Sequence, residues 1–322
     1  MTKQPTQSDY LYATARIHAI RARQNWSKEM ERLLALPDAD AVRAALREIA
    51  GATENEDAVD CILREAFRTV SESTPDPTLF RFLQYPYDCH NLKVLEKSRR
   101  KGTDPTRLLI DLGSIPAASL QTVWEKGDLS SLPAHLASAA VEAKEVFDKT
   151  ANPREIDLIL DRALYADMAE GAAGLPLSAD WVRAKADLTN LLICCRLLRS
   201  ETPDEGKVLL CRARLPVGQY GEEELLALYD AGEEELAHSL FHTPYEGIFE
   251  KDLPFSTLER RAENYVSALA LRHGTVAFGA EVAVFYLLEM QTLAANLRIL
   301  TAGKAAGLDV ETIKSRLRDC YV

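Results

Sequence analysis

The tripeptide Asn91-Leu92-Lys93 returns along the chain as Asn190-Leu191-Leu192 and again as Asn296-Leu297-Arg298, at spacings of 99 and 106 residues. A repeat at a nearly fixed period is the sequence signature of a fold built from similar units. Asparagine is mildly unfavourable inside a helix, so its recurrence needs a reason. We expect each amide to be buried and hydrogen-bonded to a neighbouring helix or loop carbonyl, because buried polar groups are satisfied within the fold. The alternative is a position that contacts a partner.

Two further patterns recur in the same order. The first is Leu63-Arg64-Glu65-Ala66, which returns as Leu160-Asp161-Arg162-Ala163 and Leu258-Glu259-Arg260. The second is Gly113-Ser114-Ile115 with Leu120 and Trp124-Glu125-Lys126-Gly127, which returns as Gly218-Gln219-Tyr220 with Leu225 and Tyr229-Asp230-Ala231-Gly232. One such match carries little weight because leucine and alanine are common. Three patterns in one order predict three copies of one unit.

These copies divide the chain into three helical repeat domains, residues 1–105, 106–206 and 207–322. Repeats of an open solenoid usually have 20–45 residues, and these units are about twice as long. We therefore expect three similar domains that close around a pseudo-threefold axis and form a funnel.

Helical spacing of apolar residues runs along most of the chain. Leu33 follows Met30 by three residues, and Leu160 and Leu164 continue the stripe that begins at Ile156. Such a stripe is typical of an amphipathic helix. Alternation of the β type is nearly absent, and Val208 to Leu215 is its best example. The sequence thus predicts an all-α fold.

Composition narrows the class of protein. The 322 residues carry 38 Lys and Arg against 49 Asp and Glu, a formal net charge of −11. This charge disfavours nucleic acid, where cations must displace counterions from phosphates, and it disfavours anionic lipid surfaces. The longest apolar stretch, Val276 to Leu288, carries Glu281 and falls short of a bilayer span. Six cysteines without a C-x-x-C pair favour a reducing cytoplasm, and no signal peptide is expected.

No catalytic, cofactor-binding or metal-binding residue is predicted. Gly303-Lys304 lacks the upstream glycine and the following Ser or Thr of a phosphate-binding loop. His238 and His242 have the i, i+4 spacing of a zinc helix but lack its glutamate, and Glu235-x-x-His238 lacks the second copy that a di-iron bundle needs. We interpret these histidines as surface or capping residues. Cys194 and Cys195 are interpreted as small core residues.

Charge clusters follow the asparagine segments. Lys97 to Lys101, Arg196 with Arg199, and Arg298 with Lys304 fit cations that oppose the macrodipole at a helix C-terminus. Only Lys97 to Lys101 is dense enough to suggest a phosphate or an acidic partner. Glu222 to Glu224 and Glu233 to Glu235 follow glycines where helices should start, and acids are favourable there.

Several segments carry a resemblance to a known family. Tyr10-Leu11-Tyr12-Ala13-Thr14-Ala15-Arg16-Ile17 resembles the opening Y-x-Y-A-x-A-R-[IV] of the C subunits of bacterial and archaeal V-type ATP synthases, and is similar to that of the d subunit of the eukaryotic vacuolar ATPase. Tyr87-Asp88-x-x-Asn91-Leu92-Lys93 resembles the family's D-x-x-N-L-K. The stretch Asn296-Leu297-Arg298-Ile299, with Gly303-Lys304 and Gly307-Leu308, resembles its closing segment. The family usually has Lys-Glu and a further acid before the last asparagine, where this chain reads Glu289-Met290-Gln291-Thr292-Leu293; that departure puts the salt bridges of those family charges in doubt.

The resemblance implies a non-catalytic component of a rotary motor. It implies a socket on the cytoplasmic face of the cell membrane that joins the central shaft, subunits D and F, to the proteolipid rotor ring, without inserting into the membrane. Two other interpretations remain: a helical-repeat adaptor unrelated to rotary motors, and an all-α enzyme such as a prenyl-chain synthase, whose D-D-x-x-D clusters are missing. The sequence leaves open proton or sodium as the coupling ion, and synthesis or hydrolysis of ATP.

Overall fold

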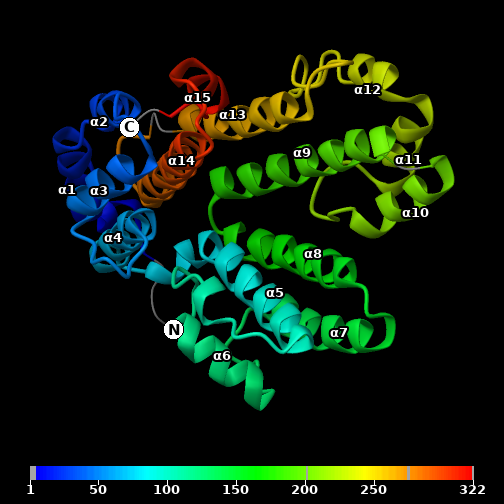
Figure 1. Ribbon diagram of the computed structural model, residues 1–322, viewed down its shortest axis with the longest axis horizontal. Helices are drawn as coiled ribbons and strands as arrows, with labels where there is room; N and C mark the ends of the chain where they lie inside the picture. Colours follow the sequence, from blue (N-terminus) through cyan, green and yellow to red (C-terminus); the bar gives the residue numbers. More distant parts are fainter. Residues whose placement is uncertain (1–4, 201, 274–275, 321–322) are drawn as a thin grey trace. The chain divides into compact units, whose positions relative to one another are not determined.

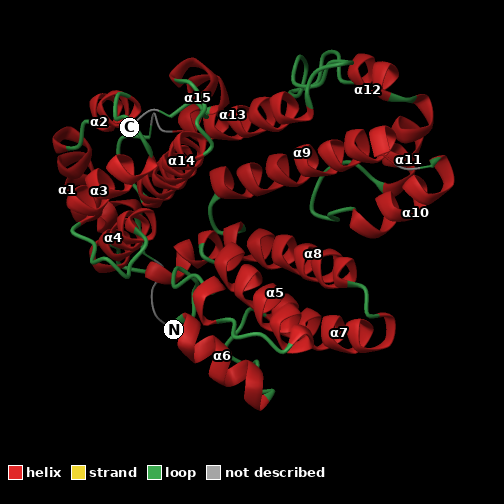
Figure 2. Cartoon of the chain, viewed as in Figure 1, coloured by secondary structure: helices red, strands yellow, loops and turns green. Residues whose placement is uncertain are grey.

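The computed structural model describes residues 5–200, 202–273 and 276–320 (Figure 1). Within these ranges the regular structure is helical, without a β-strand, which confirms the all-α prediction (Figure 2). The best β-like stretch, Val208 to Leu215, lies mostly in helix α10 (Pro203–Ala213). Val208 is 59% exposed whereas Leu210 is buried, so two positions that a strand would place on one face fall on different faces of a helix.

Contacts divide the chain into two compact units, and each is described by itself. Unit 1 comprises Met1–Thr78 and Glu259–Val322, and unit 2 comprises Leu79–Leu258. The boundaries fall within the 3-10 helix η2 (Pro77–Leu83) and within α13 (Phe255–His273). The division into three domains with borders near 105 and 206 stays a prediction.

Unit 1 is assembled from both ends of the chain. Its elements besides η2 and α13 are η1 (Gln7–Tyr10), α1 (Leu11–Arg23), α2 (Trp26–Leu34), α3 (Ala39–Ala50), α4 (Ala58–Ser73), α14 (Ala280–Ala305) and α15 (Val310–Arg316). Helix α14 packs against α4, α3 and α1. Its side chains are buried on nearly every face from Ala280 to Met290, as expected of a central core helix. No helix in the described part of the chain is long and apolar enough to cross a membrane.

Unit 2 is a succession of helices that pack mostly on their neighbours in sequence. They are α5 (Tyr85–Lys101), η3 (Thr106–Leu108), α6 (Ala117–Lys126), α7 (Ala134–Thr150), α8 (Pro153–Ala172), α9 (Pro176–Ser200), α10, α11 (Glu222–Ala231) and α12 (Glu233–Ser239). Helix α8 lies against α7, α5 and α9, and α9 lies against α10 and α11. Cys194 and Cys195 are buried on α9, which confirms their interpretation as core residues.

Local sequence explains where the helices begin and end. Asp38, Asp57 and Asp309 each accept a hydrogen bond from a backbone N–H of the first turn that follows, which satisfies one of the unpaired donors there. Helix α5 ends at Gly102, whose φ of 64° is the left-handed conformation that glycine adopts without cost. The two glutamate triplets begin α11 and α12, as predicted from the preceding glycines.

Candidate functional site

The three recurring asparagines make the same pair of hydrogen bonds. Asn91 Nδ2 donates to the carbonyl of Ile110 at 2.8 Å, and the Ile110 N–H donates to Asn91 Oδ1 at 2.8 Å. Asn190 pairs in this way with both backbone groups of Leu215, at 3.0 and 2.8 Å, and Asn296 with those of Arg318, at 2.9 and 2.7 Å. All three side chains are buried. We call each pair of bonds an asparagine clasp; the clasps confirm the buried-amide interpretation.

The recurring pattern that begins at Leu63, Leu160 and Leu258 supplies a contact beside two of these clasps. Arg162 on α8 donates to the carbonyl of Arg212, and Arg260 on α13 donates to the carbonyl of Ser315. Each accepting residue lies three positions before the residue held by the clasp, Leu215 or Arg318. The match between copies therefore extends from sequence to side-chain contacts.

A buried aspartate precedes two of the asparagines by three residues. Asp88 accepts from the backbone N–H and the hydroxyl of Ser114 at 3.0 and 2.6 Å. Asp187 accepts from the backbone N–H of Gln219 at 2.6 Å and from the Tyr245 hydroxyl at 2.7 Å. Burial raises the pKa of Asp88 to about 6, against hydrogen bonds from Ser114 that lower it. Asp187 was missed in the sequence, although its Asp-x-x-Asn spacing repeats that of Asp88 and Asn91.

The recurring glycines make room for these aspartates. A Cβ atom on Gly113 would lie 2.1 Å from Asp88 Oδ1, and one on Gly218 would lie 2.4 Å from Asp187 Oδ1. Both distances are far inside van der Waals contact, so a side chain at either position would displace the carboxylate. The recurring glycine, Gly113 or Gly218, thus belongs to the same local structure as the clasp.

The third copy replaces the aspartate with an apolar residue. Leu293 stands three positions before Asn296 and is buried. One turn earlier, Glu289 accepts from Arg21 of α1 at 2.9 Å, and the Arg21 guanidinium lies over the Phe285 ring, 5.0 Å from its centroid. Glu289 therefore keeps an ion pair in a stretch that departs from the family pattern. Burial raises its pKa to about 7, against Arg21, which lowers it.

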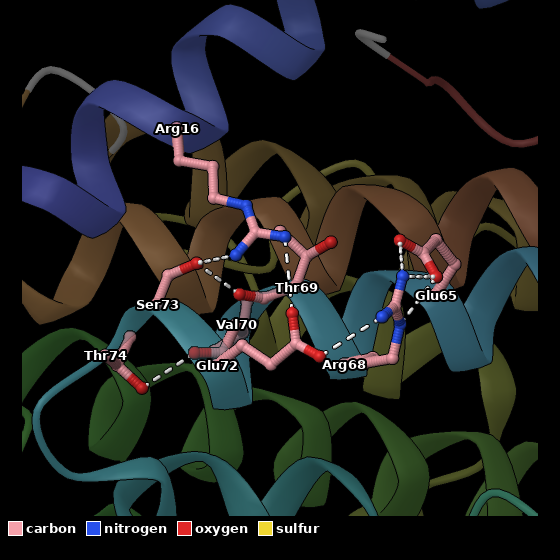
Figure 3. Close-up of polar contacts among 8 residues, drawn as sticks. All are labelled: Arg16, Glu65, Arg68, Thr69, Val70, Glu72, Ser73 and Thr74. Carbon is pink, nitrogen blue, oxygen red and sulfur yellow. Dashed lines mark hydrogen bonds and ion pairs between the residues drawn. The ribbon is translucent and has the colours of Figure 1, made fainter.

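The opening segment anchors α1 on α4. Tyr10, Ala13 and Ile17 are buried. Arg16 donates to the Ser73 hydroxyl at 3.1 Å and to Glu72 at 3.3 Å, beside an Arg68 that binds Glu65 and Glu72 (Figure 3). Figure 3 also shows the Ser73 and Thr74 hydroxyls bound to carbonyls one turn back. This packing leaves Leu11 and Tyr12 at the surface, 54% and 64% exposed.

Most cations that follow the asparagines are engaged within the fold. Lys97 binds Asp157 at 2.6 Å, Arg99 binds Asp148 at 2.7 Å, and Arg100 lies over the Phe147 ring. Arg298 binds Asp60, and Lys304 donates to the Leu36 carbonyl. These side chains do more than oppose a helix dipole, since they connect neighbouring helices. Within the Lys97 to Lys101 cluster, Lys97, Arg99 and Arg100 are therefore engaged in the fold, whereas Lys101 is exposed.

The acidic triplets have comparable internal roles. Glu224 accepts from the Gly221 N–H at 2.8 Å and so caps α11. Glu233 forms an ion pair with Arg199, and Glu234 pairs with Lys251 at 2.8 Å.

The histidine pair singled out in the sequence is split between a helix and the segment that follows it. His238 lies on α12, with its Nδ1 atom 3.9 Å from the Glu235 carboxylate and both side chains exposed. His242 lies beyond the helix, where its backbone N–H donates to Glu246. Burial raises the pKa of both Cys194 and Cys195 to about 12, so neither thiol supplies the thiolate that a nucleophile requires.

A different group of metal-capable side chains occurs within the described residues, at His135, Asp167 and Glu170. His135 Nε2 lies 2.9 Å from Glu170 Oε1, and Asp167 accepts from the backbone N–H groups of His135 and Leu136. Little in the sequence points to this group, because its histidine is more than thirty residues from its acids and an Asp-x-x-Glu step is common.

Comparison with known proteins identifies the family. Residues 13–316 match the model of the ATP synthase (C/AC39) subunit family. The chain is 25% identical over 263 residues to the C subunit of the V-type sodium ATPase of Enterococcus hirae, covering 79% of each chain. It is 29% identical over 247 residues to the C subunit of the A-type ATP synthase of Methanosarcina mazei, covering 72% of this chain and 67% of that one. The corresponding Methanosarcina barkeri protein is 28% identical over the same shares. Since the family model spans nearly the whole chain, this protein belongs to the ATP synthase (C/AC39) subunit family.

Proposed function

We propose that this protein is a non-catalytic central-rotor subunit of a V-type ATP synthase or ATPase. In this role it is the socket that couples the central shaft, subunits D and F, to the membrane proteolipid ring on the cytoplasmic face of the membrane. Its work is to pass rotation between ATP chemistry and proton or sodium transport. Its relation to the d subunit of the eukaryotic enzyme is part of the same proposal.

The recurrence of the asparagine clasp is the observation that carries the proposal. Asn91, Asn190 and Asn296 hold equivalent backbone positions by equivalent bonds, which supports three like units. In addition, α5 packs on α8 and α14 packs on α4. In sequence terms, the asparagine helix of the first copy packs on the leucine helix of the second copy. The asparagine helix of the last copy packs on the leucine helix of the first copy. Both contacts pair an asparagine helix with a leucine helix, which supports a packing that like units repeat.

The direct test is capture of the neighbouring subunits. The purified chain, immobilised, is expected to retain the separately purified D–F shaft and, in detergent, the proteolipid ring. A chain that retains neither would refute the rotary assignment and leave the helical-repeat adaptor as the hypothesis to pursue.

A second test concerns catalysis. The sequence lacks a phosphate-binding loop, so we expect the purified chain neither to hydrolyse ATP nor to bind it. Saturable binding of ATP in a calorimetric titration at micromolar concentration would contradict the non-catalytic role.

A further inference from the structure

One group of side chains is explained neither by the asparagine clasps nor by the proposed coupling role. His135 lies in the first turn of α7, and Asp167 and Glu170 lie one turn apart on α8. The imidazole and the Glu170 carboxylate are 2.9 Å apart, and a ligand atom from each of the three side chains lies within 4.8 Å of the others. Two packed helices therefore present one nitrogen and two oxygen ligands to a common point.

The negative charge of the two carboxylates in this group is not balanced by a lysine or arginine that the structure describes. Asp167 and Glu170 lie within a few ångströms of each other, and in the described part of the chain no lysine or arginine pairs with either of them. Among the described residues their basic neighbour is His135, whose Nε2 lies 2.9 Å from Glu170 Oε1. A metal binds the neutral form of this imidazole. Two carboxylates and a neutral imidazole then make a site of charge −2, which a divalent cation neutralises.

Hydrogen bonds orient the Asp167 carboxylate before any metal binds. Asp167 is buried and its two oxygens accept from the His135 and Leu136 N–H groups, at 3.1 and 2.7 Å. Hydrogen bonds of this kind fix a ligating carboxylate and sustain metal affinity. Each oxygen keeps a second lone pair for a metal. The positive end of the α7 dipole opposes a cation here, but it amounts to about half an elementary charge against two carboxylates.

We propose that His135, Asp167 and Glu170 form a binding site for a divalent transition metal of the zinc class, which fastens the N-terminus of α7 to α8. Imidazole with carboxylates suits zinc and its neighbours better than magnesium or calcium. Zinc bonds to such ligands are about 2.0–2.2 Å, which sets the ligand atoms of a tetrahedral site about 3.3–3.6 Å apart. The ligand atoms lie within 4.8 Å of one another, so metal binding requires side-chain rotations that bring them closer. The fourth position is left to water.

The test is a calorimetric titration of the tag-free chain with zinc chloride. We expect one equivalent to bind at micromolar concentration and the thermal midpoint to rise with added zinc. The variants Glu170→Gln and His135→Gln are each expected to weaken binding by more than about tenfold. Both substitutions replace surface side chains that are 69% and 45% exposed, so the fold should persist. Asp167 is left intact because its removal would also uncap α7.

The chain provides a matched control. His238 and Glu235 form another exposed histidine–glutamate pair, but among the residues that the structure describes no buried aspartate completes a group with it. The variants His238→Gln and Glu235→Gln should bind zinc as the unmodified chain does. Competing zinc ligands are the part-exposed Cys61, Cys211 and Cys320. Each titration is therefore repeated after alkylation with iodoacetamide, and zinc binding at the proposed site should persist.

Two outcomes would overturn the inference. If the alkylated chain shows no saturable zinc binding up to millimolar concentration, the group is a histidine–carboxylate ion pair and no more. If zinc binds but neither Glu170→Gln nor His135→Gln weakens it, the metal lies elsewhere. Neither outcome bears on the capture of shaft or ring, so the proposed function stands or falls separately.

Discussion

An asparagine side chain can pair with both backbone groups of one residue, because its amide carries an acceptor oxygen beside an NH₂ donor. In each clasp it satisfies both the N–H and the carbonyl of one residue in a connecting segment. A hydroxyl or a carboxylate in its place could not do the same with one rigid group. The residue identity thus follows from the two groups that have to be paired.

Loss of a clasp should be costly. Asn190→Ala leaves the N–H and carbonyl of Leu215 without partners in a buried site, and we expect the free energy of unfolding to fall by about 2–4 kcal/mol. Urea denaturation followed by circular dichroism measures this change. The control is Asn25→Ala, which removes one exposed capping bond to Lys28 and should cost only about 1 kcal/mol. Equal losses of unfolding free energy in the two variants would show that the clasp stabilises the fold no more than an exposed helix cap does.

Glu289 should make stability depend on pH. Its pKa is raised from 4.5 to about 7 in the folded chain, so the folded state holds this proton more tightly than the unfolded state does. The stabilisation of the folded state by this tighter proton binding is therefore present below about pH 4.5 and is lost as the pH rises through about 7. Between these pH values the free energy of unfolding of the unmodified chain should fall by on the order of 1–3 kcal/mol more than that of Glu289→Gln, which cannot ionise.

The comparison between these two proteins isolates Glu289 from other groups that titrate, Asp88 among them. Urea denaturation at a series of pH values provides the curves. Glu54→Gln, a change at an exposed loop residue, should follow the unmodified chain. Parallel curves for Glu289→Gln and the unmodified chain would show that Arg21 stabilises the carboxylate enough to cancel the effect of burial.

At the scale of the element, the connecting segments are held as firmly as the helices. The stretch around Gly218 bends past Asp187 so closely that a Cβ atom there would overlap the carboxylate. We expect Gly218→Ala to lower the free energy of unfolding by about 1–3 kcal/mol, in the range of an overpacked core. Gly113→Ala should behave alike, because Asp88 stands in the same relation to it.

Gly221 provides the control for this substitution. A Cβ atom there would lie 3.6 Å from Glu224 Oε2, an ordinary contact, so Gly221→Ala should change stability by less than about 1 kcal/mol. Thermal denaturation of the three variants side by side tests the ranking. If Gly218→Ala were as stable as Gly221→Ala, the close approach of glycine to aspartate would be without consequence.

Sequence reasoning succeeded where the signal is local or repeated. The helical class, the starts of α11 and α12 and the burial of the three asparagines all depend on short-range spacing or on recurrence. It failed where one residue needs a particular partner far along the chain. Lys97 binds Asp157, sixty residues away, and nothing in the segment around Lys97 distinguishes that ion pair from a free basic patch. The group at His135, Asp167 and Glu170 escaped notice for the same reason.

At the scale of the whole molecule, a repeat in sequence need not be a unit in space. The predicted borders near 105 and 206 follow the copies, whereas unit 1 joins the first 78 residues to the last 64. The joint is made by α14 against α4, with Arg298 bound to Asp60 across it. When the asparagine helix of one copy packs on the leucine helix of the next, any cut between copies in sequence passes through a packed pair of helices. Periodicity predicts a number of copies, but only contacts show which neighbours share a core.

Net charge leads to a last prediction about the shaft. The chain carries a formal charge of −11, so a partner with basic patches should be attracted, while exposed charges are screened beyond about 8 Å at physiological ionic strength. We expect affinity for the D–F shaft to weaken with added salt but to persist, since a few desolvated anchors carry most of the energy of a stable interface. The measurement is surface plasmon resonance against the shaft at several salt concentrations.

Charge reversal shows whether the acidic triplets take part. Glu223→Lys changes an exposed side chain at the start of α11 and should weaken binding at low salt more than at high salt. Reversal of Lys97 or Arg99 would break ion pairs inside unit 2, so the better control is Lys101→Glu, at an exposed residue at the end of α5. It should leave binding unchanged or raise it slightly, as added negative charge favours a basic partner. If salt has no effect and Glu223→Lys binds like the unmodified chain, then charge does not contribute to binding and the desolvated anchors alone hold the shaft.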